Sequence, residues 1–305
     1  INFKKLCQSK GKDFSVCLVE KGSEVGAHIL SGAILQPTAL DELIEDWRND
    51  DDCPVKTQVK SEELKFLSQS NSYNLPKLFI PKVMHNDNNF IISLGSLCKW
   101  LATKAEAMGV EIYPGFAASD IILSENKLMG IITSDLGLDK EGKPGPNFQP
   151  GIEIHSKYTL FAEGCRGHLG KRLIDKFNLR DNSQHQTYGI GLKELWEINP
   201  KNSDPGHVMH TIGWPLDTET YGGSFLYHLS KNIVSVGFVI GLDYKNPYMS
   251  PYDEFQRFKT HPFVKEIFNG GRRISYGARA LNEGGWQSLP KLSFPGGALV
   301  GCDAG

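Results

Sequence analysis

The segment from Phe14 to Glu20 constrains the fold more than any other, because it is an apolar run that ends in a carboxylate. The second strand of a dinucleotide-binding fold has this form, and its terminal acid accepts hydrogen bonds from the adenosine ribose. The glycine-rich turn for the pyrophosphate would precede that strand, yet only Gly11 occurs before Glu20. Alone, the pattern favours an ordinary buried strand over a nucleotide-binding strand whose first turn is missing.

Two later apolar segments also run into glycine. Tyr158–Ala162 leads into Glu163 and Gly164, and the stretch 296–300 leads into Gly301. Bare backbone at the carboxyl end of a strand is where α/β sheets bind ligands. With Glu20, these junctions occur in the order expected of a flavoprotein, so a flavin site and a set of ordinary turns are equally good interpretations of the pattern.

Composition narrows the class of protein. A chain of 305 residues can bury two domains or one large one. The net charge of −2 provides no field for nucleic acid, which excludes that partner. The six cysteines are scattered without metal-ligand spacing, and no apolar run is long enough to span a bilayer. Both ends of the sequence are abrupt, so we expect a piece of a longer protein.

The hydrophobic periodicity predicts a mixed fold. Residues 94–108 form an apolar helical stripe that ends at Gly109, and short strands follow at 110–113, 121–123 and 128–132. The Gly/Pro-rich span 142–151 indicates an exposed loop. From residue 186 the pattern becomes β, with a hairpin formed by 225–229 and 233–240. We therefore expect an α/β (α+β) protein, a Rossmann-like domain interrupted by an antiparallel-sheet domain.

Residues 27–47 are an apolar run followed by an amphipathic segment. Thr38 is placed to cap a short helix that carries Leu40, Leu43, Ile44 and Trp47 on one face. The opposite face is acidic, whereas helices that lie on membranes are usually basic. The residues leave a core helix and a membrane-surface helix both open.

Three other features have a structural and a functional interpretation. The His207-x-x-His210 pair has the spacing of metal ligands, but a loop pair is the better interpretation because no third ligand is near. Arg272 and Arg273 follow two glycines and suit a phosphate or, better, a solvated turn. Gly222-Gly223 suits a turn before the strand at Phe225 or a backbone wall against a flat ring.

Several long segments resemble the electron transfer flavoprotein–ubiquinone oxidoreductases. They are V-C-L-V-E-K-G-S-E-V-G-A-H-I-L-S-G-A from Val16, F-A-E-G-C-R-G-H-L from Phe161, Q-T-Y-G-I-G-L-K-E-L-W from Gln186, G-W-P-L-D-T-E-T-Y-G-G-S-F-L-Y-H from Gly213 and Y-G-A-R-A-L-N-E-G-G-W-Q-S-L-P-K-L-S-F-P-G-G from Tyr276. The resemblance covers nearly the whole chain in collinear order.

The resemblance implies an enzyme that passes electrons from reduced electron transfer flavoprotein through FAD and a [4Fe–4S] cluster to ubiquinone. It implies that FAD is bound by Glu20 at the adenosine ribose, by Ser31 and Gly32 at the flavin, and by Gly164 and Gly301 in the cofactor cleft. It implies that Gly222 and Gly223 bind ubiquinone. It further implies monotopic attachment near 27–47, at the matrix face of the mitochondrial inner membrane or at a bacterial inner membrane.

By the same resemblance, the FAD-binding domain is of the glutathione-reductase type and comprises residues 1–40, 85–185 and 285–305. The ubiquinone-binding domain comprises 41–84 and 186–284. The FAD glycine loop would precede Ile1 and the cluster cysteines would follow Gly305, so we expect the 305 residues alone to be inactive and to lack stoichiometric FAD. The alternatives are a geranylgeranyl-reductase-like flavoprotein and a truncated, non-catalytic flavoprotein.

Overall fold

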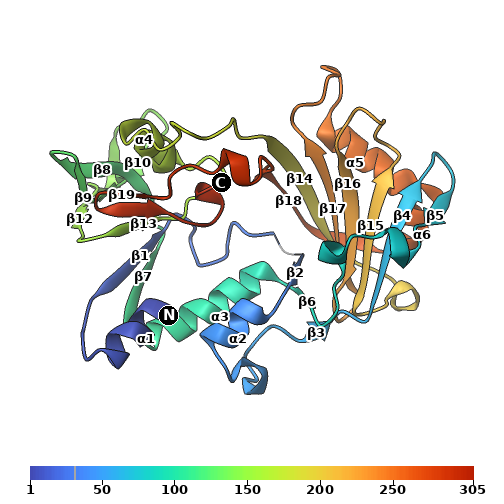
Figure 1. Ribbon diagram of the computed structural model, residues 1–305, viewed down its shortest axis with the longest axis horizontal. Helices are drawn as coiled ribbons and strands as arrows, with labels where there is room; N and C mark the ends of the chain where they lie inside the picture. Colours follow the sequence, from blue (N-terminus) through green and yellow to red (C-terminus); the bar gives the residue numbers. More distant parts are fainter. Residues whose placement is uncertain (31) are drawn as a thin grey trace. The chain divides into compact units, whose positions relative to one another are not determined.

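The computed structural model describes residues 1–30 and 32–305, which form two compact units. The first unit comprises Ile1–Val16, Val25–Glu111 and Gly189–Arg279. The second comprises Cys17–Glu24, Ile112–Tyr188 and Ala280–Gly305. Both units contain helices and strands, so the predicted mixed α/β fold is confirmed (Figure 1).

The first unit is built on a seven-stranded sheet with the strand order β18-β14-β17-β16-β15-β4-β5. Strands β16 and β17 form the predicted antiparallel hairpin, in which Gly222 pairs with Ile240 and His228 with Val234. Strand β4 runs parallel to β15 and joins a distant part of the chain to the sheet. The strands are β4 (Ser61–Leu67), β5 (Ser72–Asn74), β14 (Tyr188–Glu197), β15 (His207–Gly213), β16 (Gly222–His228), β17 (Ile233–Gly241) and β18 (Arg272–Asn282).

Two helices, α5 (Pro251–Thr260) and α6 (Pro262–Phe268), pack on one face of this sheet. Ser250 caps α5 by accepting a hydrogen bond from the backbone N–H of Asp253, and proline is suited to the first turn of each helix. Alternate residues of the central strands meet the helices in the main core. Its buried residues are Leu67, Ile198, Met209, Leu226, Val234, Val236, Phe238, Ile240, Phe255, Phe258, Val264 and Phe268.

The rest of the first unit comprises a small sheet and three helices. The sheet order is β2-β6-β3, and Trp47 and Trp100 lie in a second core with α2 and α3. Helix α3 confirms the predicted helix, since it starts at the Ser93 cap and Gly109 follows it with a left-handed φ of +78°. The elements are α1 (Asn2–Ser9), β2 (Ala33–Leu35), α2 (Thr38–Leu43), β3 (Thr57–Gln58), β6 (Phe90–Ile92) and α3 (Leu94–Glu106).

The second unit contains several short strands and one helix. Strands β13 and β20 are parallel neighbours, and α4 follows β13 as expected. Its core comprises Leu128, Ile131, Phe161, Leu169, Leu173, Leu179, Phe294, Leu299 and Ala304. The elements are β1 (Val16–Glu20), β7 (Val110–Pro114), β8 (Ala118–Ser124), β9 (Lys127–Thr133), β10 (Leu136–Leu138), β11 (Pro144–Gln149), β12 (Glu153–His155), β13 (Thr159–Phe161), α4 (His168–Lys176), β19 (Ser293–Phe294) and β20 (Gly297–Leu299).

Two local expectations were wrong. The span 142–151 is not a loop throughout, because β11 pairs with β10. The segment Tyr158–Ala162 is only partly buried, since Leu160 is 62% exposed and Phe161 is the buried residue. The compact units are drawn differently from the expected domains, since residues 85–111 cluster with the seven-stranded sheet, and the expected division stays a prediction. The assignment of a cofactor or a quinone to either domain stays a prediction.

Candidate functional site

The seven-stranded sheet has two chemically different faces. One face is covered by α5 and α6, and we call it the helix face; the opposite one is the distal face. Because side chains alternate along a strand, the residue pairing assigns each residue to a face. Leu226 packs on the helices, so Gly223, Phe225 and Tyr227 of the same strand belong to the distal face.

Three rows of residues cross the distal face. Pairing between neighbouring strands joins them, except that Ile212 and Gly223 of the first row are joined by a contact, since Ile212 Cγ2 lies 3.7 Å from a Cβ position at Gly223. The first row has little side-chain bulk at its centre and consists of Gly191, Val239, Gly223, Ile212 and Phe66. The second row consists of Lys193, Gly237, Phe225, His210 and Leu64. The third row consists of Leu195, Ser235, Tyr227, Val208 and Glu62.

In the second row, the ring of Phe225 occupies the space that a side chain at position 237 would fill, because that residue is glycine. A Cβ built at Gly237 would overlap that ring. The Phe225 ring stacks on Tyr227 with 4.5 Å between centroids, and the Lys193 ammonium lies 5.6 Å from the Phe225 centroid. Burial and the positive charge of Arg279 lower the pKa of Lys193.

His210 and Tyr227 form a polar pair on the same face. His210 Nε2 lies 2.9 Å from the Tyr227 hydroxyl oxygen. Burial lowers the pKa of His210, and the Glu62 carboxylate opposes that shift. Burial raises the pKa of Tyr227 well above its usual range, so the phenol stays protonated. The pair combines a titratable ring with a fixed hydrogen-bonding partner.

Glu62 is a buried carboxylate at the end of the third row. Its Oε2 accepts hydrogen bonds from the backbone N–H of Asn86 at 2.9 Å and from the Asn86 amide at 3.1 Å. Its Oε1 is buried without a hydrogen-bond partner among the described residues. Lys77 Nζ and His85 Nδ1 approach Oε1 only to 3.6 and 3.8 Å. Glu62 also lines a small cavity of about 140 Å³.

Two of the predicted residues of the first unit, Gly32 and Gly223, lie on this distal face, whereas Gly222 lies on the helix face, where it pairs with Ile240. Gly32 is packed against Ser235, where a Cβ would overlap the serine side chain, and its φ of +114° favours glycine. Gly222 and Gly223 lie inside strand β16, so their interpretation as a turn was wrong. Ser31 lies outside the described residues. The distal face therefore carries Gly32 and Gly223 beside Phe225 and His210.

The remaining predicted cofactor residues belong to the second unit. Oε1 of Glu20 accepts a hydrogen bond from the Gly22 N–H at 2.6 Å, so the acid closes the turn after β1. Gly164 and Gly301 follow β13 and β20, whose parallel pairing places both glycines at the same edge of the sheet. Both have left-handed φ values, +87° and +63°, and a Cβ at Gly301 would meet no atom within 4 Å.

Two carboxylates at this edge were missed by the sequence analysis. Oε2 of Glu163 accepts hydrogen bonds from the N–H groups of Leu169 and Gly170, at 2.8 and 2.7 Å, and so caps α4. Burial and the Glu163 charge raise the pKa of Asp303 to about 6. Asp303 Oδ2 is buried without a hydrogen-bond partner among the described residues. The sequence could have indicated the capping role of Glu163, because this acid lies five residues before the start of α4.

Of the two interpretations left open for the segment 27–47, the contacts of the described residues 32–47 favour the core element. Helix α2 ends at Leu43, and no side-chain cap precedes it, so Thr38 is its first residue rather than a capping one. Leu40 and Trp47 are buried in the core with α3, which uses the apolar face that a membrane would need. The described residues contain no helix with the length and hydrophobicity required to cross a bilayer.

The contacts of the histidine pair and of the two arginines show what these weaker candidates do in the fold. His207 bonds Ser61 at 2.8 Å and lies near His228 on the helix face, so it points away from His210. Arg272 and Arg273 open strand β18 rather than a turn and pair with Glu197 and Glu194. Across residues 1–30 and 32–305, no three His, Cys, Asp or Glu side chains are grouped as metal ligands.

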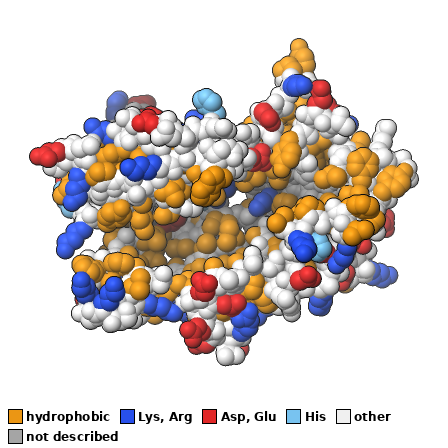
Figure 2. Space-filling model, in the orientation of Figure 1, with side chains coloured by type: hydrophobic (Ala, Val, Ile, Leu, Met, Phe, Trp, Pro, Cys, Tyr) orange, Lys and Arg blue, Asp and Glu red, His pale blue; other side chains and the backbone are white. Residues whose placement is uncertain are grey.

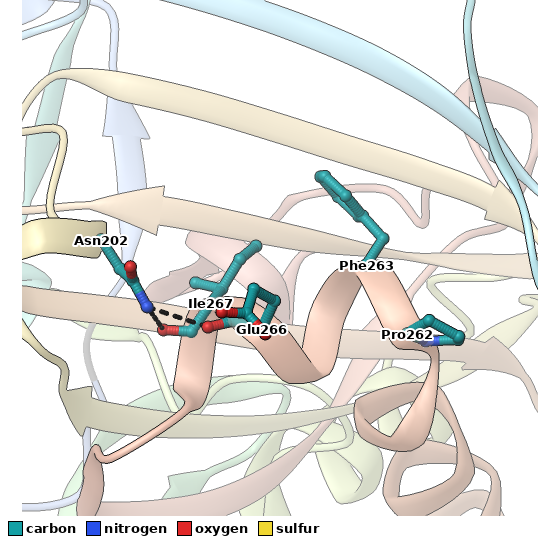
Figure 3. A pocket seen from close by; sticks show the side chains of 5 residues that line it. All are labelled: Asn202, Pro262, Phe263, Glu266 and Ile267. Atoms are coloured by element: carbon teal, nitrogen blue, oxygen red, sulfur yellow. Dashed lines mark hydrogen bonds between the residues drawn. The ribbon is translucent and has the colours of Figure 1, made fainter.

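A hollow of about 470 Å³ beside α6 is lined by few polar side chains that could bind a ligand (Figure 3). Pro262, Phe263, Glu266 and Ile267 of α6 line it together with Asn202. The Asn202 amide donates hydrogen bonds to the carbonyls of Glu266 and Ile267, at 2.8 and 3.3 Å. Its polar side chain therefore closes the end of the helix, and the distal face remains the better candidate site.

The chain matches known proteins over almost its whole length. A family model described as "ETF-QO, ubiquinone-binding" matches residues 188–281. Electron transfer flavoprotein–ubiquinone oxidoreductases from Pseudomonas aeruginosa and from human are 56% and 52% identical over 298 and 309 residues. These alignments cover 97% and 100% of this chain but 54% and 50% of the relatives, so the chain spans about half of their length.

Solved structures share the fold at low sequence identity. A geranylgeranyl bacteriochlorophyll reductase-like protein from Thermoplasma acidophilum has a TM-score of 0.69 at 17% identity, covering 95% of this chain and 65% of its own. A flavoprotein/dehydrogenase from Cytophaga hutchinsonii has a TM-score of 0.63 at 17% identity, covering 99% and 68%. These matches confirm a fold shared with flavoproteins, while the reductase-like alternative has only this likeness of fold in its favour.

Proposed function

Because the chain belongs to the electron transfer flavoprotein–ubiquinone oxidoreductase family over the region that it spans, we propose that the whole protein passes electrons from reduced electron transfer flavoprotein through FAD to ubiquinone. The observation that carries this proposal is the first row of the distal face, all of which except Phe66 lies in the stretch matched by the ubiquinone-binding model. Gly191 and Gly223 leave bare backbone there, which suits a flat ring. The family's [4Fe–4S] cluster would be held by residues outside this chain.

The residues of the second unit fit FAD. Gly301 presents open backbone beside Gly164, and the orphaned Asp303 Oδ2 offers an acceptor for a hydroxyl-rich ligand. We assign Glu20 to the adenosine ribose and Gly164 and Gly301 to the rest of the cofactor. Bound there, FAD would supply the redox chemistry, whereas this chain holds and orients it. In the first unit, we assign Ser31 and Gly32 to the flavin ring.

The Glu20 assignment is tested in the full-length protein by flavin affinity. Glu20→Ala should weaken FAD binding by about 1.5–3 kcal/mol, the value of hydrogen bonds to a charged group. Glu20→Gln is the matched control, because its amide oxygen can still accept the Gly22 bond while the charge is lost. Unchanged affinity in both variants would remove Glu20 from the cofactor site.

The quinone assignment needs a substitution that fills the first row without disturbing the sheet. A Cβ at Gly223 would lie 2.6 Å from the Thr211 carbonyl oxygen, so Gly223→Val would disrupt β15 before it met a quinone. Ile212 adjoins Gly223, since its Cγ2 atom lies 3.7 Å from the position of a Cβ at Gly223, and its side chain is 42% exposed. Ile212→Trp should therefore raise the KM for a soluble ubiquinone at least about tenfold and leave FAD content unchanged.

The control for Ile212→Trp is Ile152→Trp in the second unit, where the side chain is 53% exposed. Reduction of the flavin by its protein donor should survive in both variants. Equal quinone KM values in the two variants would show that the first row does not bind the quinone. Loss of flavin from Ile212→Trp alone would instead indicate a folding defect.

We also propose that the protein contacts a membrane surface through residues 77–84, at a mitochondrial or bacterial inner membrane. Leu78, Phe79 and Val83 are 90%, 74% and 93% exposed, and Lys77 and Lys82 flank them. Figure 2 shows hydrophobic side chains at the surface around β4 and β5, next to this segment. Exposed apolar side chains with lysines suit insertion into the headgroup region.

The membrane proposal is tested by liposome flotation. Replacing Leu78, Phe79 and Val83 by serine should abolish binding to anionic vesicles. Tyr248→Ser, at a site that is 94% exposed, is the control and should float like the wild type. Flotation of the triple variant at wild-type levels would contradict the proposal.

A further inference from the structure

The distal face places one titratable ring next to the proposed quinone row. His210 pairs directly with Phe225 across β15 and β16, and Gly223 lies two residues further along β16 on the same face. Diagonal neighbours of this kind are roughly 7–8 Å apart, within reach of a histidine side chain and a ring lying on the glycine. The other nearby positions of the first two rows are apolar or glycine, except for Lys193.

Resting on the proposed function, we propose that His210 is the proton donor to one carbonyl oxygen of the quinone, with Tyr227 and Glu62 as its positioning residues. Reduction of a quinone to a quinol consumes two electrons and two protons. The FAD assigned above would supply the two electrons. The N–H bond of the His210 imidazolium breaks, an O–H bond forms on the quinone, and a neutral imidazole remains. The second proton, for the other oxygen, comes from solvent.

Tyr227 determines which nitrogen of His210 donates the proton to the quinone. The Tyr227 hydroxyl oxygen lies 2.9 Å from Nε2 of His210, and the Tyr227 ring is held in place because it stacks on Phe225. The imidazole is thereby held with Nδ1 as the nitrogen that gives up the proton. Tyr227 is only 8% exposed and packs with Ile91 and Val208, so it orients the ring and does not itself reach solvent.

Glu62 supplies the charge that favours the imidazolium. Oε1 is buried without a hydrogen bond among the described residues, and Lys77 and His85 face it at 3.6 and 3.8 Å without closing a tight pair. Its negative charge opposes the effect of burial on His210. Negative charge arriving on the quinone acts in the same direction as Glu62. The ring thus gains a proton most readily when the quinone is being reduced.

The test is the pH dependence of quinone turnover in full-length protein, with reduced electron transfer flavoprotein as donor and a soluble ubiquinone as acceptor. Wild-type kcat should fall as the pH rises through the pKa of His210, because only the imidazolium donates. His210→Gln should lower kcat by about 10²-fold and abolish this decrease of kcat with rising pH, the alkaline limb of the pH profile. Glu62→Gln should move the limb to lower pH, and Tyr227→Phe should lower kcat with little change in KM.

His207→Gln is the matched control, because His207 lies on the same strand and faces the other side of the sheet. It should keep both kcat and the pH limb. FAD content and flavin reduction by the donor should be normal in every variant. A pH limb that persists unchanged in His210→Gln, or a change in KM alone, overturns the proposal for His210. A wild-type protein that reduces its flavin but no quinone overturns the proposed function itself, and the relay with it.

Discussion

The two faces of the seven-stranded sheet use polar residues differently. On the helix face, Glu194 is 1% exposed and accepts hydrogen bonds from Lys259, Trp196 and Arg273. On the distal face, Glu62 keeps one buried oxygen without a hydrogen bond among the described residues. Buried polar groups are normally satisfied, so an exception calls for an explanation. The comparison supports the proposal that the distal face binds a ligand, although part of that face, with Val208, Phe225 and Tyr227, is packed in a hydrophobic cluster with Ile91.

The sharpest test of this comparison replaces each carboxylate by its amide. Glu194→Gln should lower the free energy of unfolding by about 3–5 kcal/mol, because Lys259 and Arg273 lose the buried charge that they share. Burial alone would raise the pKa of Glu194, but the hydrogen bonds from Lys259, Trp196 and Arg273 keep it lowered, which confirms that the charged form is favoured in the fold.

Glu62→Gln should change stability by less than about 1 kcal/mol, since an amide oxygen can still accept the Asn86 bonds and Lys77 is mostly in water. Urea unfolding of the two variants at neutral pH gives both values. If Glu62→Gln costs as much as Glu194→Gln, the distal face is as tightly balanced as the helix face and the comparison fails.

A second test uses acid. His228 lies on the helix face, 4% exposed, and its Nδ1 accepts the Asp204 N–H at 3.2 Å. Burial and the nearby His207 lower the pKa of His228 to about 4 from 6.5. Because the unfolded chain binds the proton more tightly, stability is present above pH 6.5 and is lost as the pH falls towards 4.

The expected loss from His228 is about 3 kcal/mol across that interval. His228→Gln should retain an acceptor for Asp204 and flatten this part of the pH profile of unfolding. His210→Gln on the distal face should flatten it less, since Glu62 offsets part of the effect of burial there. Profiles that flatten equally would mean that Glu62 does not favour the His210 cation.

A third test concerns a glycine that shapes the distal face. A Cβ at Gly237 overlaps the ring of Phe225, which is held against Tyr227. Gly237→Ala should therefore cost about 1–3 kcal/mol, the usual penalty for overpacking. Gly277→Ala is the control, because its Cβ would lie 3.5 Å from Leu30, an ordinary contact. Thermal unfolding should show a loss only for Gly237→Ala; equal transitions would show that the Phe225 ring moves freely.

Local patterns in the sequence predicted the elements whose cause is local. The stripe and the terminal glycine of α3, the hairpin of β16 and β17 and the strand before Glu20 were all found, although the expectation that this strand is buried was wrong, since Leu18 is 44% exposed. The span 142–151 was wrong because β11 depends on pairing with β10, which periodicity in one segment does not reveal. Helix α2 ends at Leu43, before the expected Trp47, and Trp47 is instead buried in the core with α3.

The site was less accessible from the sequence for the same reason. Gly222 and Gly223 were singled out, yet their role as a turn or a wall depended on strand pairing. His210 was noticed only for its spacing from His207, and the two rings face opposite sides of the sheet. Glu62 comes from β4, which joins β15 from far along the chain. Such juxtapositions are set by tertiary register and have no signal in one sequence.

The smallest expected effect comes from Lys193, which is best compared with a lysine of the helix face. Lys259 on the helix face donates to both oxygens of Glu194, at 2.9 and 2.7 Å, and its side chain is 13% exposed. Lys193 on the distal face lies over the ring of Phe225, and the positive charge of Arg279 acts on it. Methionine keeps much of the volume of a lysine stem, so Lys→Met isolates the charge at each site.

Lys193→Met should change the free energy of unfolding by less than about 1 kcal/mol, and in the stabilising direction at neutral pH. The sign follows from linkage: burial and Arg279 lower the pKa of Lys193, so its charged form disfavours the fold until the pH rises through that pKa. Above the unfolded value of 10.5 the wild type is relieved of this cost and the gain from methionine should vanish. Lys259→Met should instead destabilise at every pH where Glu194 is ionised. Unfolding curves of both variants at neutral and alkaline pH decide the matter: if Lys193→Met destabilises as Lys259→Met does, the distal lysine is part of the scaffold, and the division between a structural face and a binding face is wrong.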